Sequence, residues 1–185
     1  MRSRTPRSNG RSTGADGFTL IELLIVVAMI AVLATIAFPI LLRARISAHE
    51  GSAIGSLRAI HSAEAAYAAS CGAGGYAQSL EDLALKPPLA DVAFIEPPFD
   101  TNGAIQNGYE TWLMAASGAG TVLSAADTCN GSADDAVTGF VAERHPVTVG
   151  ETGVRSFAIG TEGTMYQRND GAAIDDALSG TIVLP

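Results

Sequence analysis

The sequence is poor in the residues that build most active sites. Its 185 residues include two cysteines, three histidines and one tryptophan. It contains no glycine-rich phosphate loop, no cysteine or histidine cluster and no nucleophile elbow, so the common nucleotide-binding, metal-binding and hydrolase motifs are missing. We therefore do not expect an enzyme, and we expect no cofactor.

Basic residues are scarce after residue 50. From Gly51 onward the chain has five basic and sixteen acidic residues, a formal charge of −11. We predict no nucleic acid contact for this part, because it would repel phosphates. Residues 1–17 have the opposite balance, with four arginines against Asp16 alone, a formal charge of +3.

Polar residues are almost absent between Phe18 and Leu42, where only Thr19, Glu22 and Thr35 interrupt the apolar side chains. A helix of about 20 such residues is long enough to span a bilayer. A basic segment before this span and an acidic body after it predict a cytoplasmic N-terminus and an exported C-terminal part. The apolar run is longer than a signal-peptide core of about 7–15 residues. A plain membrane anchor stays possible, but it gives no reason for Glu22, since a carboxylate in hydrocarbon costs roughly 2.5–3.5 kcal/mol.

Residues 17–39, GFTLIELLIVVAMIAVLATIAFP, resemble the N-terminus of type IV pilins and pseudopilins. The resemblance implies that a prepilin peptidase cuts between Gly17 and Phe18 and methylates the new amino group of Phe18. Members commonly carry a basic residue where this chain has Asp16, but the junction glycine is present. The resemblance further implies an inner-membrane precursor, an inner-membrane assembly platform, and a periplasmic or extracellular filament made of copies of the chain.

Cleavage would give Glu22 a partner. The cut creates an α-amino group at Phe18, one helical turn from the carboxylate, and a cation there would favour the ionised acid. The amine could pair with Glu22 of its own chain or of a neighbour, and the family implies the neighbour, which makes Glu22 an assembly residue. Pro39 predicts a kink or loosened turn. A similar proline in pilins implies melting of roughly residues 31–39 in the filament.

Beyond residue 42 the pattern becomes amphipathic, and one face carries apolar residues at spacings of 3, 4 or 7. These are Ile46, Ala53, Leu57, Ile60, Ala63 and Tyr67. We predict one helix from Phe18 to about Ser70, ended by the glycines after Cys71. The predicted divisions are a leader (1–17), an apolar helix (18–42), its amphipathic continuation (43–70) and a head (71–185).

The pattern of residues 71–185, together with the resemblance to pilins, predicts an α+β, type IV pilin-like fold. In this fold a small antiparallel sheet of three to four strands covers the amphipathic face of the helix. A short helical turn is expected at residues 79–85. The candidate strands are residues 109–115, 139–145, 155–159 and 164–168, the last two joined as a hairpin. The tail from Asn169 has no clear pattern.

Several polar groups are candidates for a disulfide, a side-chain pair or a calcium site. Cys71 and Cys129 fall on the exported side, which favours a disulfide over two buried thiols. His61 and Glu64 could touch as a solvated or core-edge pair, while His49 and His145 have no evident partner. Two oxygen-rich clusters could be considered for calcium, although neither spacing matches a calcium loop. They are residues 169–171 with Asp175 and Asp176, and Asp127, Asn130, Asp134 and Asp135.

The sequence therefore predicts a structural subunit of a type IV pilus-like filament. A secretion pseudopilin or a minor pilin is the alternative within the family, because the N-terminal motif is shared. A monomeric, membrane-anchored surface binding module is the alternative from another class, and it would need neither cleavage nor Glu22.

Overall fold

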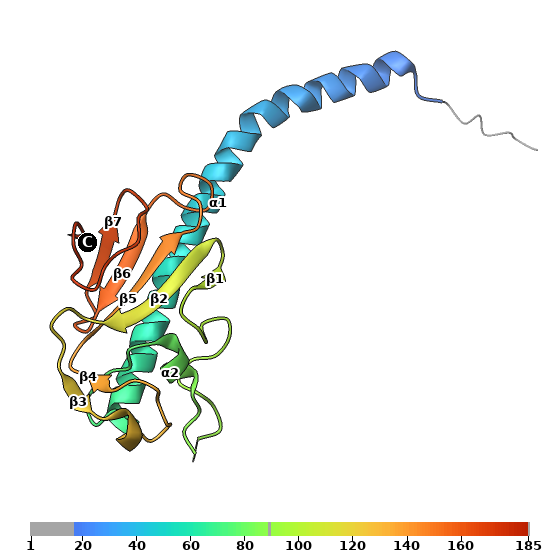
Figure 1. The fold of residues 1–185 in the computed structure, drawn as a ribbon. Helices are drawn as coiled ribbons and strands as arrows, with labels where there is room; N and C mark the ends of the chain where they lie inside the picture. The colour runs from blue at the N-terminus through green and yellow to red at the C-terminus, as the bar shows by residue number, and fades with distance from the viewer. Residues whose placement is uncertain (1–16, 89, 185) are drawn as a thin grey trace, which may run out of the picture. The chain divides into compact units, whose positions relative to one another are not determined.

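A computed structural model of the chain describes residues 17–88 and 90–184 (Figure 1). Most of the predicted leader therefore lies outside the described residues, with Gly17 as its one described member. The chain divides into two compact units, Met1–Ile40 and Leu41–Pro185. We describe the two units separately.

Helix α1, Leu20–Ser70, contributes to both units. The helix begins at Leu20, two residues after the predicted start at Phe18. Gly17, Phe18 and Thr19 are not helical. In the first unit the helix is apolar on every side, and each described residue of this unit is exposed. A helix that is apolar all round has no polar face to turn to water, so its surroundings must be lipid or protein.

In the second unit α1 has one buried stripe. Five of the six predicted apolar positions are buried, and Ile46 is half-buried. Two acids, Glu50 and Glu64, share the stripe and are also buried. The helix ends where the backbone N–H groups of Cys71 and Gly72 both donate to the carbonyl of Tyr67, at 2.8 and 2.9 Å. Gly75 then passes close to the sheet region, since a Cβ there would lie 2.9 Å from Cβ of Val122.

The main sheet is antiparallel and has the order β1-β2-β5-β6-β7-β8. Its strands are β1 Ala104–Gln106, β2 Tyr109–Ala115, β5 Phe140–Pro146, β6 Ser156–Gly160, β7 Met165–Arg168 and β8 Ile182–Val183. A separate two-stranded sheet pairs β3 Thr121–Leu123 with β4 Ala136–Val137. Short helices lie at α2 Leu80–Ala84 and η1 Ala125–Asp127.

The fold class is confirmed, but the predicted number of strands was wrong. The four predicted strands form the centre of the sheet, and β1 and β8 extend it at the two edges. Both added strands have three residues or fewer, too short to show an alternating pattern. Asn107 and Gly108, with φ of 51° and 72°, form the two-residue turn that joins β1 to β2, a common hairpin sequence.

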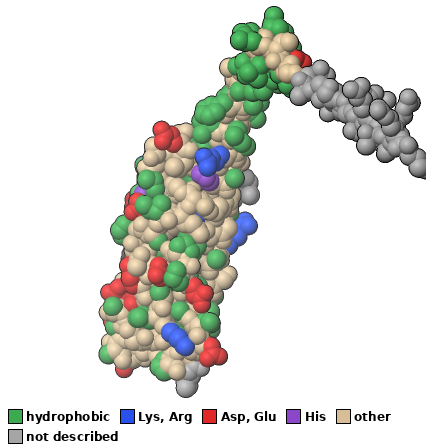
Figure 2. Space-filling model, turned by 90° about the vertical axis from the view of Figure 1, so that its right-hand side faces the viewer, with side chains coloured by type: hydrophobic (Ala, Val, Ile, Leu, Met, Phe, Trp, Pro, Cys, Tyr) green, Lys and Arg blue, Asp and Glu red, His purple; other side chains and the backbone are tan. Residues whose placement is uncertain are grey.

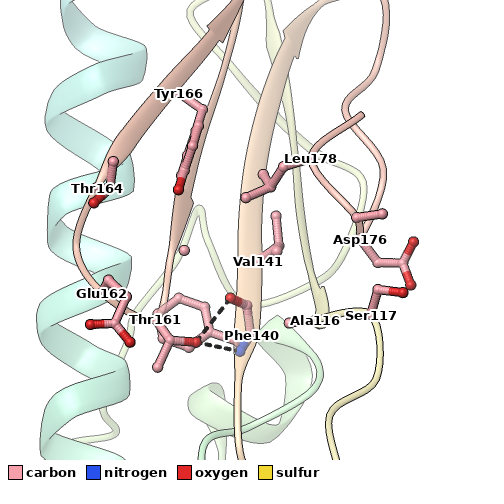
Figure 3. A pocket seen from close by; sticks show the side chains of 12 residues that line it. Ala116, Ser117, Phe140, Val141, Thr161, Glu162, Thr164, Tyr166, Asp176 and Leu178 are labelled. Atoms are coloured by element: carbon pink, nitrogen blue, oxygen red, sulfur yellow. Dashed lines mark hydrogen bonds between the residues drawn. The ribbon is translucent and has the colours of Figure 1, made fainter. Parts of the chain in front are cut away.

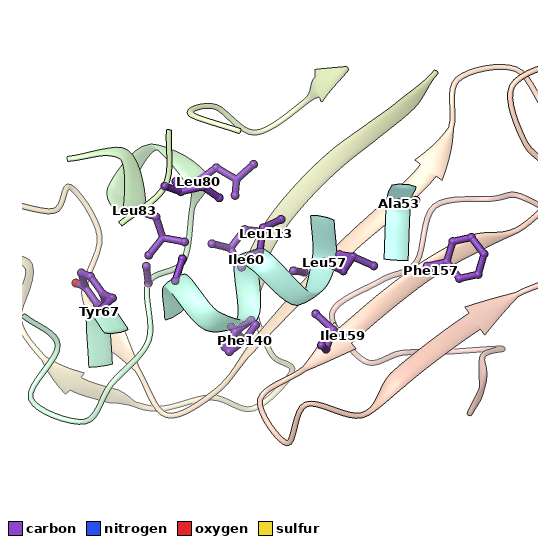
Figure 4. Close-up of a cluster of buried hydrophobic side chains, with 14 of the residues drawn as sticks. Ala53, Leu57, Ile60, Tyr67, Leu80, Leu83, Leu113, Phe140, Phe157 and Ile159 are labelled. Carbon is purple, nitrogen blue, oxygen red and sulfur yellow. The ribbon is translucent and has the colours of Figure 1, made fainter. Parts of the chain in front are cut away.

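The inner face of the sheet packs on α1. Figure 4 shows Leu57 and Ile60 of the helix among Leu113, Phe140 and Ile159 of the strands. Leu80 and Leu83 from α2 close the same cluster, and all seven of these side chains are at most 2% exposed. Complete burial of a leucine or phenylalanine side chain stabilises by about 1.5–3 kcal/mol, so this cluster holds the amphipathic half of α1 to the head.

The outer face of the sheet is covered in part by the C-terminal segment. Ile174, in a region without a clear sequence pattern, is 2% exposed and packs with Val141 and Ala158. Its backbone N–H lies 3.5 Å from a carboxylate oxygen of Glu143 on β5. The tail is thus an ordered cover of the outer face.

Candidate functional site

The apolar helix begins with a capping arrangement. The backbone N–H of Glu22 donates to Oγ1 of Thr19 at 3.2 Å, and the Thr19 hydroxyl lies 3.5 Å from Oε2 of Glu22. Thr19 therefore occupies the N-cap position and Glu22 the N3 position, and the recorded contacts show the Thr19 half of a capping box. The sequence T-x-x-E at residues 19–22 indicates such a helix cap. The sequence-based prediction gave Glu22 an assembly role and did not include the cap.

The cap supplies no cation to the Glu22 carboxylate. Within the part of the chain that the structure describes, Thr19 is the one group recorded in contact with this carboxylate. Phe18, whose amine would be freed by cleavage, is 83% exposed next to it. A carboxylate at a helix N-terminus is stabilised by the helix dipole, but in an apolar medium it still needs a charged partner.

The rest of the apolar helix offers contact surface and little chemistry. Its side chains from Phe18 to Leu42 are exposed in the single chain, and one face carries a shallow apolar hollow. The hollow is lined by Leu24, Ile25, Ala28, Met29, Val32 and Leu33. By length and composition this is one helix that could cross a membrane. Such a surface can be covered by lipid or by other apolar helices.

Pro39 lies inside α1, and the residues from 31 to 39 are helical in the single chain. Proline has no N–H, so the carbonyl of Thr35 lacks its usual helical partner. The hydroxyl of Thr35 bonds to the carbonyl of Val32 at 2.7 Å, a local contact of the kind that slightly destabilises helices. The helix is therefore weakest around residues 35–39, where the melting in a filament is predicted.

Cys71 and Cys129 form a disulfide that connects the end of α1 to the segment after η1, with Cα atoms 4.7 Å apart. The same segment is held by polar contacts. Ser132 bonds to the hydroxyl of Tyr67 at 3.0 Å, and Asp82 accepts the N–H of Ala133 at 2.7 Å. The disulfide thus closes a region that buried polar groups already organise.

Two buried acids attach α1 to the head in different ways. Glu50 accepts the N–H groups of Val154 and Arg155, both at 3.2 Å, and forms an ion pair with Arg155 at 2.6 Å. Burial alone would raise the pKa of Glu50, but the hydrogen bonds and charge of Arg155 lower it. Glu64 accepts the N–H of Ala77 at 2.9 Å, forms no ion pair among the described residues, and has a pKa that burial raises to about 8.

The predicted pairing of His61 with Glu64 was wrong. Glu64 faces the core and is 0% exposed, while Nε2 of His61 contacts the carbonyl of Thr161 at 3.3 Å. Glu50 and Glu64 lie seven residues before and after Leu57, on the same helical stripe, and this spacing could have predicted their burial.

Two histidines have partners that the sequence did not suggest. Nδ1 of His49 contacts the carbonyl of Thr152 at 2.9 Å. His145 lies between two carboxylates, 2.9 Å from Glu143 and 3.5 Å from Glu110, and its hydrogen bond to Glu143 is the main cause of its raised pKa. Glu143 and His145 are two residues apart on β5 and therefore lie on the same face of the sheet. Glu110 on β2 is the register partner of His145.

The described residues contain no group of three His, Cys, Asp or Glu side chains placed to hold a metal ion. In the C-terminal cluster, Asp170 pairs with Arg168 at 2.8 Å and Asp175 accepts the N–H of Ser179 at 2.7 Å. These carboxylates shape turns. Asn130-Gly-Ser132 fits the acceptor pattern for N-glycosylation, but the Asn130 amide donates to the carbonyl of Asp82 and Ser132 is 6% exposed.

A cavity of about 370 Å³ lies on the outer face of the sheet. Figure 3 shows Asp176 and Leu178 of the C-terminal segment on one side and Tyr166 and Thr164 on the other. Thr161 is already bonded to the backbone of Phe140, at 2.9 and 3.3 Å. The remaining lining offers no buried charged group, so this cavity carries no clear chemistry.

Comparison with known families identifies the N-terminal segment. The model of the prokaryotic N-terminal methylation motif matches residues 14–38, which include the helix cap and most of the apolar helix. This motif is the type IV pilin and pseudopilin signature, and it supports a pilin-like or pseudopilin precursor. The signature is typical of structural proteins that are membrane-anchored as precursors, not of enzymes. No curated protein and no solved structure matches the chain.

Proposed function

We propose that this protein is a structural subunit of a type IV pilus-like filament. A prepilin peptidase cuts the precursor between Gly17 and Phe18 and methylates Phe18. An inner-membrane platform then assembles the mature chain through its apolar helix. The filament is periplasmic or extracellular, and the folded head covers its surface.

One observation supports this proposal above the others. The apolar part of α1, most of which lies within the methylation motif, is exposed in the single chain and contains one carboxylate, Glu22, with no cation recorded beside it among the described residues. Cleavage supplies a cation at Phe18, and other copies of the helix supply the apolar cover. A monomeric anchor would need the cover of lipid but not the charge.

The first test is the mass of the N-terminus. Protein purified from cells with an active prepilin peptidase should begin at Phe18 and carry one added methyl group. A Gly17→Glu variant should keep the whole leader and form no filament. An intact leader on the wild-type chain in those cells would contradict the proposal and favour the anchored binding module.

The second test separates the two roles of Glu22. Glu22→Gln keeps a polar side chain at N3 but removes the charge, and Thr19→Ala removes the cap but keeps the charge. If charge pairing drives assembly, Glu22→Gln should lose most filaments and Thr19→Ala should retain them. If Glu22→Gln keeps wild-type filaments while Thr19→Ala loses them, the cap matters and the pairing argument fails.

The amount of protein in sheared fibres distinguishes the family alternatives. A major pilin should be the main component of these fibres. A minor pilin or a secretion pseudopilin should be scarce there, although its N-terminus would be processed in the same way.

A further inference from the structure

The loop between β5 and β6 exposes apolar side chains at one end of the head. Val147, Val149 and Val154, which we name the valine loop, are 50%, 53% and 44% exposed. Val149 and the backbone of Val154 are neighbours, because both lie within 3.2 Å of the position that a Cβ on Gly171 would take. Three exposed valines therefore lie in one short segment that the described part of the head does not cover.

The valine loop is fixed to the first head-bound turns of α1. His49 contacts the carbonyl of Thr152 at 2.9 Å, and Glu50 accepts the N–H of Val154 at 3.2 Å. The Tyr109 hydroxyl bonds to the carbonyl of Arg155 at 2.8 Å from the sheet side. Because α1 contacts the opposite end of the head at Tyr67 and Cys71, the valine loop marks the end at which the chain enters the head.

This end of the head is close in sequence to the last apolar residue of the membrane segment. From Arg43 to His49 there are six residues, which correspond to about 9 Å along a helix. The headgroup layer of a bilayer is roughly 5–8 Å thick on each side. The contacts of the loop with α1 therefore begin at a distance along the helix that is similar to the thickness of the headgroup layer.

The charges beside the loop fit an anionic surface. Arg43 and Arg45 are exposed on α1, whereas Glu151 is the one acid of the loop. Figure 2 shows basic and histidine side chains together near this end of the head, with one acidic group at the same end and more acidic side chains toward the opposite end. Juxtamembrane arginines are attracted to anionic headgroups, and the rest of this acidic head is repelled by them.

We propose that the valine loop, together with Arg43 and Arg45, is a membrane-facing contact that rests in the anionic headgroup layer before assembly. The proposal depends on the membrane-anchored precursor proposed above. It gives the head a fixed side toward the bilayer, and this contact must be released when the subunit leaves the membrane.

The test uses the full chain in phosphatidylcholine vesicles that contain phosphatidylglycerol, with acyl chains brominated near the headgroup. The native tryptophan is replaced by Trp112→Phe, and one new tryptophan is introduced at a time. Val149→Trp and Val147→Trp report the loop. Val122→Trp, an exposed position near the opposite end of the head, is the matched control, and Phe38→Trp reports insertion of the helix.

Bromine should quench the loop tryptophans several-fold more than Val122→Trp, and the difference should shrink without phosphatidylglycerol. Equal quenching of loop and control tryptophans, with Phe38→Trp quenched, would overturn the membrane contact alone. A shielded loop tryptophan that bromine does not quench would also overturn it and would indicate a protein partner. An unquenched Phe38→Trp would overturn both the membrane-anchored precursor and this contact.

Discussion

Replacing Glu64 with glutamine should stabilise the head at high pH and leave it almost unchanged at low pH. Glu64 is 0% exposed on α1, and its Oε2 accepts the N–H of Ala77 at 2.9 Å. Its Oε1 has no hydrogen-bond partner among the described residues. Burial, with a further contribution from the negative charge of Asp82, raises its pKa from 4.5 to about 8, so the folded head holds this carboxyl neutral at neutral pH.

The size of the effect follows from proton linkage. Below pH 4.5 Glu64 is protonated in both the folded and the unfolded chain. As pH rises, the unfolded chain releases this proton while the folded chain keeps it, so stability falls by about 1.4 kcal/mol per pH unit. The fall ends near the folded-state pKa of about 8. Across that interval the loss is on the order of 5 kcal/mol, which is comparable to the whole stability of many domains.

Glutamine cannot lose a proton, and its carbonyl oxygen can still accept the N–H of Ala77. Glu64→Gln should therefore match the wild type within about 1 kcal/mol at pH 5. Above pH 8 it should be the more stable of the two by several kcal/mol. Other groups with raised pKa values, such as Asp82 and Glu143, add slopes of the same sign to both proteins. The difference between variant and wild type isolates Glu64.

Urea unfolding of the full chain in detergent, followed from pH 5 to pH 9, measures this difference. Trp112, the single tryptophan, lies on β2 and reports the head alone. Glu162→Gln, at an exposed glutamate, is the matched control and should not change the slope. The reasoning is refuted if Glu64→Gln keeps the pH slope of the wild type, or if it is destabilised equally at every pH.

Three further predictions follow from other contacts of the head. Glu50→Ala should cost about 2–3 kcal/mol, because it leaves buried N–H groups and a half-exposed guanidinium without an acceptor, and urea unfolding would measure the loss. Cys129→Ser should lower stability by about 4 kcal/mol, as the chain-entropy model gives for a loop of 58 residues, and the loss should disappear when both proteins are measured in reductant. His145→Gln should lose most stability at acidic pH and least at alkaline pH. Glu143 and Glu110 raise the pKa of His145, so its contribution is present below its unfolded pKa and is lost as pH rises through the folded value, and a pH series of urea titrations would test this.

The sequence predicted those parts of the fold that have a long or regular pattern. Helix α1 was predicted because its apolar run continues into spacings of 3 and 4, and β2 was predicted within its observed bounds. The edge strands β1 and β8 were missed because two or three residues show no period, and backbone pairing with a neighbour decides such strands. The order of the tail over the outer face also depends on a long-range contact, between Ile174 and Glu143.

The polar residues of the site were harder to predict. Their partners depend on the position of each residue on its helix or strand more than on its residue type. A contact between Glu64 and His61 was expected as an option because the two residues are polar and three residues apart. The spacing of Glu64, four from Ile60 and three from Tyr67, places it on the buried stripe. The sequence did not predict a partner for His145, because Glu143 and Glu110 lie on two strands whose register a single sequence does not show. The helix cap at Thr19, in contrast, is indicated by the four consecutive residues 19–22.

The acids of α1 show three solutions to one physical problem. Each carboxylate lies where water is scarce or is expected to be scarce, and each must find a cation or lose its charge. Glu50 has Arg155 and stays ionised, and Glu64, which forms no ion pair among the described residues, stays protonated. Glu22 has a helix cap but, among the described residues, no cation. In the head the fold itself supplies the solution, through a residue about a hundred positions away or through burial. For Glu22 the contacts recorded among the described residues supply no cation, and the solution that we propose is a cut at Phe18 and another copy of the chain.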